Sequence, residues 1–288
     1  MKKRFLVPII TPFNEDESVN YDALAKLTRA VLDSGANGIY ASGSSAECFL
    51  LNEEERKKTL ETVIKAADGA YVMAHVGNIG NKITVELAEH AKKVGANAIA
   101  SVPPFYFSYP FEGIKSYYAD IAKVGLPVIV YSLPSRTRNF TTEEYKELMS
   151  IDGIEGIKFT DTNYFAMQQI IAHTGKFVYS GCDECFISAL AQGANGAIGT
   201  TFNYMMENYI EIYDLFHKGE NEKALEIQRR SNAVTAACLN NGGLPAFKYL
   251  TTLRHGIDCG SSRKPFMPLT PEQKKHLEKV AIEYGVLK

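Results

Sequence analysis

The chain has 288 residues, and its 31 Lys and Arg against 33 Asp and Glu give a formal net charge of −2. With 45% hydrophobic and 22% charged residues the composition is that of a globular protein, which excludes intrinsic disorder. Near-neutral charge argues against a nucleic-acid surface, and no apolar run approaches the ~18–20 residues that a membrane helix needs. Five cysteines, together with a basic N-terminus broken by prolines and unlike an export signal, predict free thiols in a reducing cytoplasm.

Short β-branched runs recur along the chain, each followed by a charged segment whose apolar residues have helical spacing. They are Phe5–Ile10, Gly38–Ser42, Tyr71–Val76, Ala98–Val102, Pro127–Tyr131, Ile154–Phe159, Phe177–Ser180 and Gly196–Thr200. The tripeptide Gly-Ala-Asn precedes three of them, and its glycine is expected to end the preceding helix in the left-handed conformation. Strand–helix alternation implies parallel pairing, and eight such units predict an α/β fold, a closed (β/α)8 TIM barrel.

An open doubly wound sheet is the main alternative, but its G-x-G-x-x-G phosphate loop is absent after the first run. Beyond about residue 220 no strand-like run occurs, and three helices are expected at Ala224–Leu239, Leu244–His255 and Pro271–Tyr284. The sequence therefore predicts a barrel over residues 1–217 and a three-helix C-terminal extension over 218–288. No low-complexity linker separates the two parts, so we expect a single compact domain.

Lys158 stands out among the residues at the carboxyl ends of the predicted strands, where barrel enzymes carry their chemistry. It follows the apolar run Ile154–Ile157, whereas most other lysines lie on polar helix faces. Burying an ammonium group without a partner is costly, and a desolvated amine is what imine formation with a ketone requires. A lysine at the rim, paired with a carboxylate, is an equally good interpretation of this position.

Three other strand ends carry polar or titratable groups. Tyr131 ends the neighbouring strand, where a phenol can pass a proton to a hydroxyl, although a place in the core is more common for one tyrosine. The turn Gly43–Glu47 offers N–H groups and two hydroxyls to a carboxylate, while a helix cap by serine is the simpler interpretation. His75 is expected to be buried with its hydrogen bonds satisfied.

Cys182 and Cys185 form a C-x-x-C after the seventh run, which nominally resembles a redox motif or half of a zinc site. No second pair and no paired histidines follow at zinc spacing, so neither a metal nor a redox role is predicted. Asp183 and Glu184 between the cysteines are more informative, because carboxylates at a strand end can hydrogen-bond substrate hydroxyls.

Together these residues resemble the family of pyruvate-dependent class I aldolases that includes dihydrodipicolinate synthases and N-acetylneuraminate lyases. The resemblance extends over nearly the whole chain, and its markers are Ile10–Phe13, the G-x-x-G-E-like loop Gly43–Glu47, Pro104–Tyr106, Tyr131-x-x-Pro134, Gly156–Lys158 and Arg263–Phe266. It implies an eight-stranded barrel with a helical appendix, usually assembled as a homotetramer. It also implies a reaction that needs no metal or organic cofactor, because the protonated imine accepts the electrons.

The resemblance further implies a role for individual residues. Lys158 would form the Schiff base with a keto acid, Tyr131 would shuttle protons at the scissile bond, and Ser44 and Ser45 would hold the pyruvate carboxylate. Tyr106 would lie near a subunit interface. Within the family the chain looks like the lyases, and five of its positions match those that bind the polyhydroxylated part of a sugar acid: Thr160, Gly181, Asp183, Glu184 and Thr200. The implied reaction is reversible cleavage of N-acetylneuraminate to N-acetylmannosamine and pyruvate.

Two positions depart from the family pattern. Ala46 replaces the second glycine of the G-x-x-G-E loop and is expected to tighten the carboxylate turn. Arg136 is typical of the synthases, where an arginine grips the second substrate's carboxylate, so condensation of pyruvate with aspartate semialdehyde is the alternative reaction.

The lyase interpretation is preferred, because the loop around Tyr106 lacks the synthases' Tyr-Asn-Lys-Pro run and Asp183-Glu184 is not their pattern. A barrel that binds keto acids without catalysis is a further alternative. The presence of both Lys158 and Tyr131 argues against it.

Overall fold

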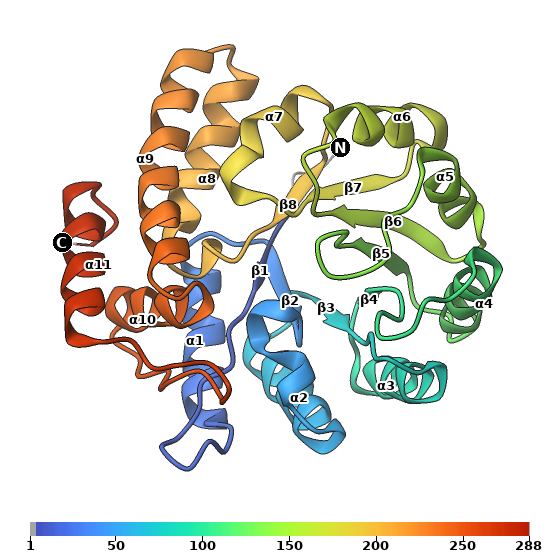
Figure 1. Ribbon diagram of the computed structural model, residues 1–288, viewed down its shortest axis with the longest axis horizontal. Helices are drawn as coiled ribbons and strands as arrows, with labels where there is room; N and C mark the ends of the chain where they lie inside the picture. Colours follow the sequence, from blue (N-terminus) through green and yellow to red (C-terminus); the bar gives the residue numbers. More distant parts are fainter. Residues whose placement is uncertain (1–3, 288) are drawn as a thin grey trace.

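A computed structural model describes residues 4–287 and contains a closed barrel of eight parallel strands, each paired with its neighbours in chain order (Figure 1). Because β1 also pairs with β8, the predicted (β/α)8 barrel is confirmed and an open doubly wound sheet is excluded. β1 ends two residues earlier than predicted, since Ile10 N–H donates to the Asn203 side chain. The strands are β1 Arg4–Pro8, β2 Gly38–Ala41, β3 Tyr71–His75, β4 Ala98–Ser101, β5 Val128–Ser132, β6 Ile154–Phe159, β7 Phe177–Ser180 and β8 Gly196–Ile198.

An α-helix follows each strand of the barrel. These helices are α1 Tyr21–Asp33, α2 Glu53–Ala67, α3 Asn81–Val94, α4 Phe111–Ala122, α5 Thr142–Ser150, α6 Tyr164–Thr174, α7 Phe186–Ala191 and α8 Phe202–His217. Short 3-10 turns interrupt two of the connections: η1 Ser44–Ala46 and η2 Cys48–Leu50 after β2, and η3 Asp183–Cys185 after β7. No helix within residues 4–287 has both the length and the apolar character needed to cross a bilayer.

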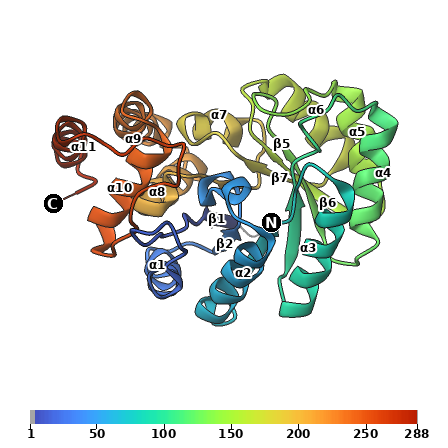
Figure 2. The same cartoon turned by 60° about the horizontal axis from the view of Figure 1, so that its bottom comes forward.

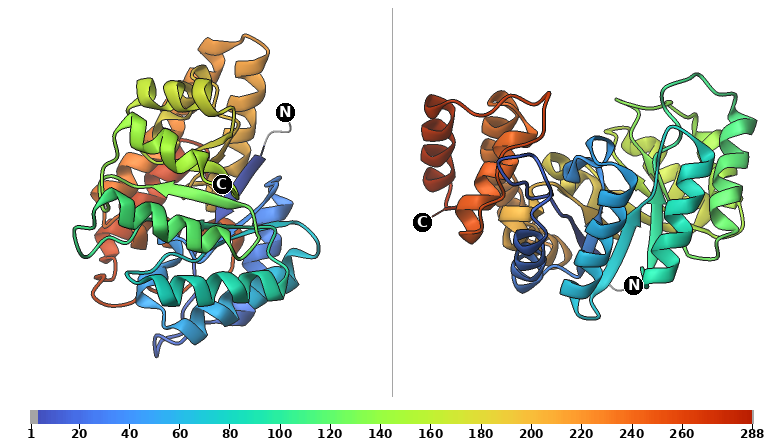
Figure 3. Two further views of the ribbon diagram at one scale, coloured as in Figure 1. Left: turned by 90° about the vertical axis from the view of Figure 1, so that its right-hand side faces the viewer. Right: turned by 90° about the horizontal axis from the view of Figure 1, so that it is seen from below.

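Three further helices form the C-terminal extension: α9 Asn221–Asn240, α10 Leu244–His255 and α11 Pro271–Glu283. α9 and α10 pack against α8, and α11 packs against α9 and α10. Figures 1, 2 and 3 agree in placing the extension at one side of the barrel, opposite α4. The expected three helices are confirmed. The last barrel helix, α8, ends at His217, and the first helix of the extension, α9, begins at Asn221.

Side chains of the strands alternate between two cores, because successive residues of a strand point to opposite faces. Outward residues such as Phe5 and Val7 pack against the helices. Inward residues fill the barrel: Leu6, Tyr40, Met73, Ala98, Ala100, Ile129, Tyr131, Tyr179 and Ile198. Arg4 closes the amino end of the barrel, where its guanidinium lies 4.3 Å from the centre of the Tyr71 ring and donates to the Tyr179 hydroxyl (3.2 Å). The polar groups that remain lie at the carboxyl ends of the strands.

The three Gly-Ala-Asn tripeptides connect a helix end to a strand start. Their glycines have φ of +96°, +93° and +93°, as expected for left-handed helix ends: Gly35, Gly95 and Gly193. Each asparagine also accepts a hydrogen bond, through its side-chain oxygen, from an N–H of the preceding strand at 2.7–2.8 Å, in the pairs Asn37–Phe5, Asn97–Val72 and Asn195–Val178. The repeat therefore joins the start of one strand to its neighbour.

We expect Asn195→Ala to destabilise the fold by about 1–2 kcal/mol, because the N–H of the fully buried Val178 loses its side-chain acceptor. Asn195→Asp keeps an oxygen at this position and should lose less. Urea denaturation followed by circular dichroism gives both free energies of unfolding. A loss below ~0.5 kcal/mol in the alanine variant, the range of an ordinary surface substitution, would contradict this role.

Candidate active site

The register of the barrel brings Lys158 and Tyr131 together, because the two residues are direct partners in the pairing of β5 with β6. Lys158 is 5% exposed, and its Nζ lies 4.1 Å from the centre of the Tyr131 ring and 4.8 Å from that of Tyr40. Within the described residues, the amine has no hydrogen bond and no carboxylate partner. The structure therefore does not show a lysine paired with a carboxylate. It shows an amine held between two aromatic rings and removed from bulk water, an environment suited to imine formation.

Tyr40 is a site residue that the sequence analysis missed. Its hydroxyl is buried and has no hydrogen-bond partner among residues 4–287, and burial holds the pKa of this phenol well above 10. The signal was present in the two-residue period of β2, which places Tyr40 on the inward face at the strand end. Its ring packs edge-on against that of Tyr131, with centroids 6.2 Å apart.

His75 lies against both tyrosine rings but is fully engaged by the backbone. Its Nδ1 lies 3.0 Å from the Ser42 carbonyl oxygen, and Val102 N–H donates to its Nε2 at 3.3 Å. These two contacts place the proton on Nδ1. Burial, with a smaller contribution from Arg56, holds the pKa of His75 well below 6.5, so the ring is neutral at pH 7. The expectation of a buried, satisfied histidine is confirmed.

The two serines after β2 belong to η1, and neither hydroxyl caps this turn, so the capping interpretation is wrong. Ser45 Oγ instead lies 2.7 Å from Thr200 Oγ1, which follows β8. Thr11 Oγ1, which follows β1, donates to the Ala46 carbonyl at 2.8 Å. The N–H groups that begin such a turn have no partner within it, so those of Ser44 and Ser45 remain available as donors.

Glu47 ends this turn in the left-handed conformation, with φ of +58°. Its carboxylate is buried and accepts from Lys248 Nζ of α10 at 3.1 Å and from Arg263 N–H at 2.8 Å. Burial lowers the pKa of Lys248 from its usual value. The sequence analysis included Glu47 only as part of the loop and missed its partner, since nothing in the sequence relates two residues 201 positions apart.

Thr160 and Gly181, two of the positions that match sugar-acid-binding residues of the lyases, lie together directly after β6 and β7. A side chain on Gly181 would overlap with Thr160 Oγ1, so only glycine fits beside this threonine. Thr160 Oγ1 is buried and has no hydrogen-bond partner within the part of the chain that the structure describes. It is thus a hydroxyl without a protein partner near the carboxyl end of β6.

Asp183 is buried in η3, and its Oδ2 accepts from both the N–H (2.9 Å) and the hydroxyl (2.8 Å) of Thr201. Burial raises the pKa of Asp183 to about 6, against the lowering effect of these hydrogen bonds. The carboxylate therefore holds the turn after β8 in place through Oδ2. Thr201 donates no hydrogen bond to the other oxygen, Oδ1.

Three predicted site residues are exposed, and the structure gives none of them a contact with Lys158 or Tyr131 within the described residues. Tyr106 is 74% exposed and packs against Phe107, Arg136 lies on the loop after β5, and Glu184 follows Asp183. All five cysteines are free, and no group of three or more His, Cys, Asp or Glu among residues 4–287 could hold a metal ion.

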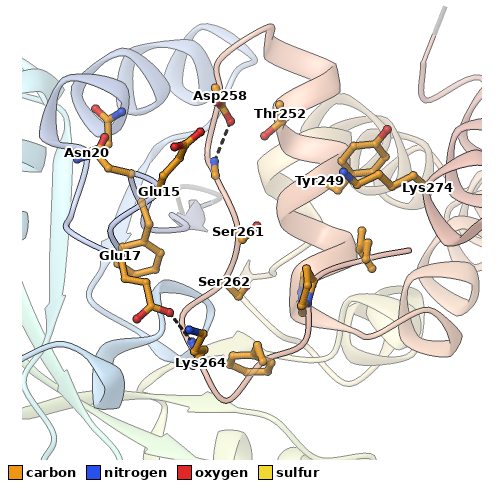
Figure 4. Close-up of a pocket in the computed structure, with 17 residues that line it drawn as sticks. Glu15, Glu17, Asn20, Tyr249, Thr252, Asp258, Ser261, Ser262, Lys264 and Lys274 are labelled. Carbon is orange, nitrogen blue, oxygen red and sulfur yellow. Dashed lines mark hydrogen bonds between the residues drawn. The ribbon is translucent and has the colours of Figure 1, made fainter. Parts of the chain in front are cut away.

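A separate pocket of about 650 Å³ lies between residues 13–20 and the extension and is lined by none of the predicted site residues. In Figure 4, Glu15 and Glu17 lie on one side of the segment 258–264, and Tyr249 and Lys274 lie on the other. Lys264 N–H donates to the Glu17 carboxylate at 3.1 Å, which joins the segment to the first loop of the barrel.

A closed (β/α)8 barrel with a buried lysine and a tyrosine at its carboxyl end has the architecture of a barrel enzyme of the Schiff-base type. Residues 1–283 match the Dihydrodipicolinate synthetase family, and the chain belongs to this family. The resemblance seen in the sequence is thereby confirmed.

Similar proteins include lyases and a synthase. An N-acetylneuraminate lyase of Rhizobium meliloti (strain 1021) is 38% identical over 261 residues, which are 90% of this chain and 87% of that protein. A crystal structure of CdNal from Clostridium difficile in complex with mannosamine is 29% identical, with a TM-score of 0.95 and 99% of both chains covered. A crystal structure of a dihydrodipicolinate synthase is also 29% identical, with a TM-score of 0.90 over 99% of this chain and 100% of that one. The backbone alone therefore does not separate the two activities.

The raised pKa of Asp183 predicts a pH-dependent contribution to stability. Because the folded chain holds this proton up to about pH 6 and the unfolded chain only to about 3.8, the stabilisation is fully present only below pH 3.8 and is lost as the pH rises from there through 6. Relative to Asp183→Asn, which cannot titrate, the wild type should lose about 2 kcal/mol between pH 4 and pH 7.

Urea denaturation of both proteins at several pH values in this range measures the difference, and titration of all other groups cancels between them. Asp152→Asn, at an exposed carboxyl, is the control and should run parallel to the wild type. Parallel curves for Asp183→Asn and wild type would show that Asp183 does not titrate in this range.

Proposed function

We propose that this chain is a Schiff-base lyase that reversibly cleaves N-acetylneuraminate to N-acetylmannosamine and pyruvate. The observation that carries the proposal is the Lys158 amine, buried at the carboxyl end of the barrel with its Nζ 4.1 Å from the centre of the Tyr131 ring. Identity of 38% to a named lyase over 90% of the chain favours this reaction over the synthase alternative.

The reaction starts when the Lys158 amine attacks the ketone of the open-chain sugar acid and water leaves, which gives a protonated imine. The Tyr131 phenol assists removal of the proton from the C4 hydroxyl. The C3–C4 bond then breaks, the C4 oxygen becomes the carbonyl of N-acetylmannosamine, and the electron pair moves into the enamine. Protonation at C3 and hydrolysis of the imine release pyruvate and restore Lys158. The N–H groups and hydroxyls of Ser44 and Ser45 hold the carboxylate throughout.

The remaining matched residues would bind the hydroxyl-rich part of the substrate. These are Thr160, Gly181, Asp183, Glu184 and Thr200. The partnerless Thr160 hydroxyl supports this assignment, because a buried polar group without a partner is unfavourable until a ligand supplies one. Gly181 leaves room for this hydroxyl, because a side chain at position 181 would overlap with Thr160 Oγ1.

We also propose a homotetramer in which the loop after β4 lies at a subunit interface. Tyr106 and Phe107 are 74% and 63% exposed and pack against each other, with ring centroids 4.9 Å apart. Such a pair of large aromatic side chains on the surface supports a contact with another subunit. The five free thiols support a place in the reducing cytoplasm.

Borohydride reduction in the presence of pyruvate should add mass to the peptide that contains Lys158. We expect Lys158→Met to abolish both trapping and cleavage. Tyr131→Phe keeps the ring beside the amine, so trapping should persist while cleavage falls roughly 100- to 10,000-fold through loss of the proton carrier. Labelling of another lysine in the wild type, or equal loss of trapping in both variants, would contradict these roles.

The choice of reaction is tested with Arg136. In the wild type, we expect kcat/KM to be higher for cleavage of N-acetylneuraminate than for condensation of pyruvate with aspartate semialdehyde. Arg136→Leu should change the cleavage value less than about fivefold, because the arginine is exposed. Preference for the semialdehyde, lost in Arg136→Leu, would establish the synthase reaction. Trapping of pyruvate without turnover of either substrate would establish a keto-acid-binding barrel.

A further inference from the structure

The extension reaches into the barrel through one buried ion pair. Lys248 Nζ of α10 lies 3.1 Å from Glu47 Oε1, and both side chains are 1% exposed. The lysine also donates to the Ser261 carbonyl at 3.0 Å and packs against the Phe13 ring, with Nζ 4.1 Å from its centre. Its ammonium group thus has a carboxylate and a carbonyl as acceptors and is fixed in place by both.

Glu47 is the residue through which this pair can act on the serine turn. It joins η1 to η2 in a left-handed conformation that a residue with a side chain rarely adopts. Its N–H donates to the Ser44 carbonyl at 3.0 Å, so the orientation of its backbone sets that of the turn. A buried carboxylate that lost its cation would move toward water or bind a proton, and the backbone of Glu47 would follow.

Arg263, in the segment after α10, contacts the same region at Glu47, Leu50 and Glu55. Arg263 N–H donates to Glu47 Oε2 at 2.8 Å, and the Arg263 guanidinium donates to the Leu50 carbonyl at 2.7 Å and pairs with Glu55. The extension therefore contacts Glu47, Leu50 and the start of α2 at Glu55. Thr11 and Thr200 contact the serine turn from the barrel side.

We propose that Lys248 is a positioning residue for the keto-acid carboxylate. It fixes Glu47, Glu47 fixes the N–H and hydroxyl groups of Ser44 and Ser45, and these set the affinity for the carboxylate before Lys158 reacts. The inference rests on the proposed function, because it requires that this turn binds the keto acid. Lys248 itself does not touch the reacting atoms. Its loss should therefore weaken recognition of the carboxylate and leave the reactivity of the Lys158 amine unchanged.

An ion pair that joins the extension to the barrel away from the serine turn provides a control. Arg254 of the same helix α10 pairs with Glu207 of α8 at 2.6 Å, and these side chains are 30% and 49% exposed. This pair also joins the two parts of the chain but has no connection to the serine turn. Arg254→Met therefore tests how trapping changes when the extension loses an ion pair to the barrel that does not contact the serine turn.

The experiment compares borohydride trapping at Lys158 by pyruvate with trapping by acetone, which has the ketone and the methyl group but no carboxylate. Lys248→Met should raise the pyruvate concentration for half-maximal trapping roughly tenfold or more, as expected for loss of well-aligned hydrogen bonds to a charged group. The value for acetone should stay within about twofold. Lys248→Arg keeps a cation beside Glu47 and should recover part of the loss, and Arg254→Met should match the wild type for both ketones.

Glu47→Gln/Lys248→Met removes both charges together, so it gives a folded protein for the same comparison if the single variant leaves too costly a buried carboxylate. It should show the same selective loss for pyruvate. An unchanged half-maximal concentration in a folded variant, or an equal rise for pyruvate and acetone, would overturn the role of Lys248. Absence of trapping at Lys158 in the wild type would instead overturn the proposed function and this inference with it.

Discussion

The constraint on which the site depends is the enclosure of one amine inside a barrel where no carboxylate among residues 4–287 forms an ion pair with it. Lys158 faces inward because β6 alternates its side chains, and pairing with β5 and β7 puts tyrosines on both neighbouring strands. The aromatic faces of Tyr40 and Tyr131 provide weak electrostatic compensation, far less than a carboxylate would. The stability needed to hold the amine there comes from the closed strand ladder and the two cores. At the opposite end of the barrel, Arg4 contacts Tyr71 and Tyr179.

The extension contributes to the barrel through charges rather than through an apolar face alone. A buried ion pair is a weak source of stability, since desolvation offsets most of the attraction, but it is specific in geometry. The pair of Glu47 with Lys248 therefore suits a positioning task better than a purely stabilising one. It also explains why a loop that follows β2 depends on residues more than 200 positions later in the chain.

The period of the apolar residues predicted the barrel and the three added helices, because both follow from local spacing. The same reasoning placed Lys158 and Tyr131 at neighbouring strand ends and noticed the Gly-Ala-Asn repeat, although not the second role of its asparagines. It could not find Glu47–Lys248, which depends on tertiary packing of segments distant in sequence. It also favoured a serine cap after β2, where the structure has a 3-10 turn whose Ser45 hydroxyl contacts Thr200 across the barrel end. Tyr40 could have been considered, since the strand period allows it to face inward, but only the closed barrel brings its ring beside Lys158.

The distribution of buried charge is compatible with the proposed binding of an anionic substrate by a chain of net charge −2. Three Lys and Arg side chains within residues 4–287 are buried in this region: Arg56, Lys158 and Lys248. Arg56 donates to the carbonyls of His75 and Gly77, and Lys248 is neutralised by Glu47. The nearby acid Asp183 has its Oδ2 engaged by Thr201 and a pKa of about 6. Only the Lys158 amine is left without a protein acceptor among these three, so the local field favours an anion there whatever the total charge of the protein.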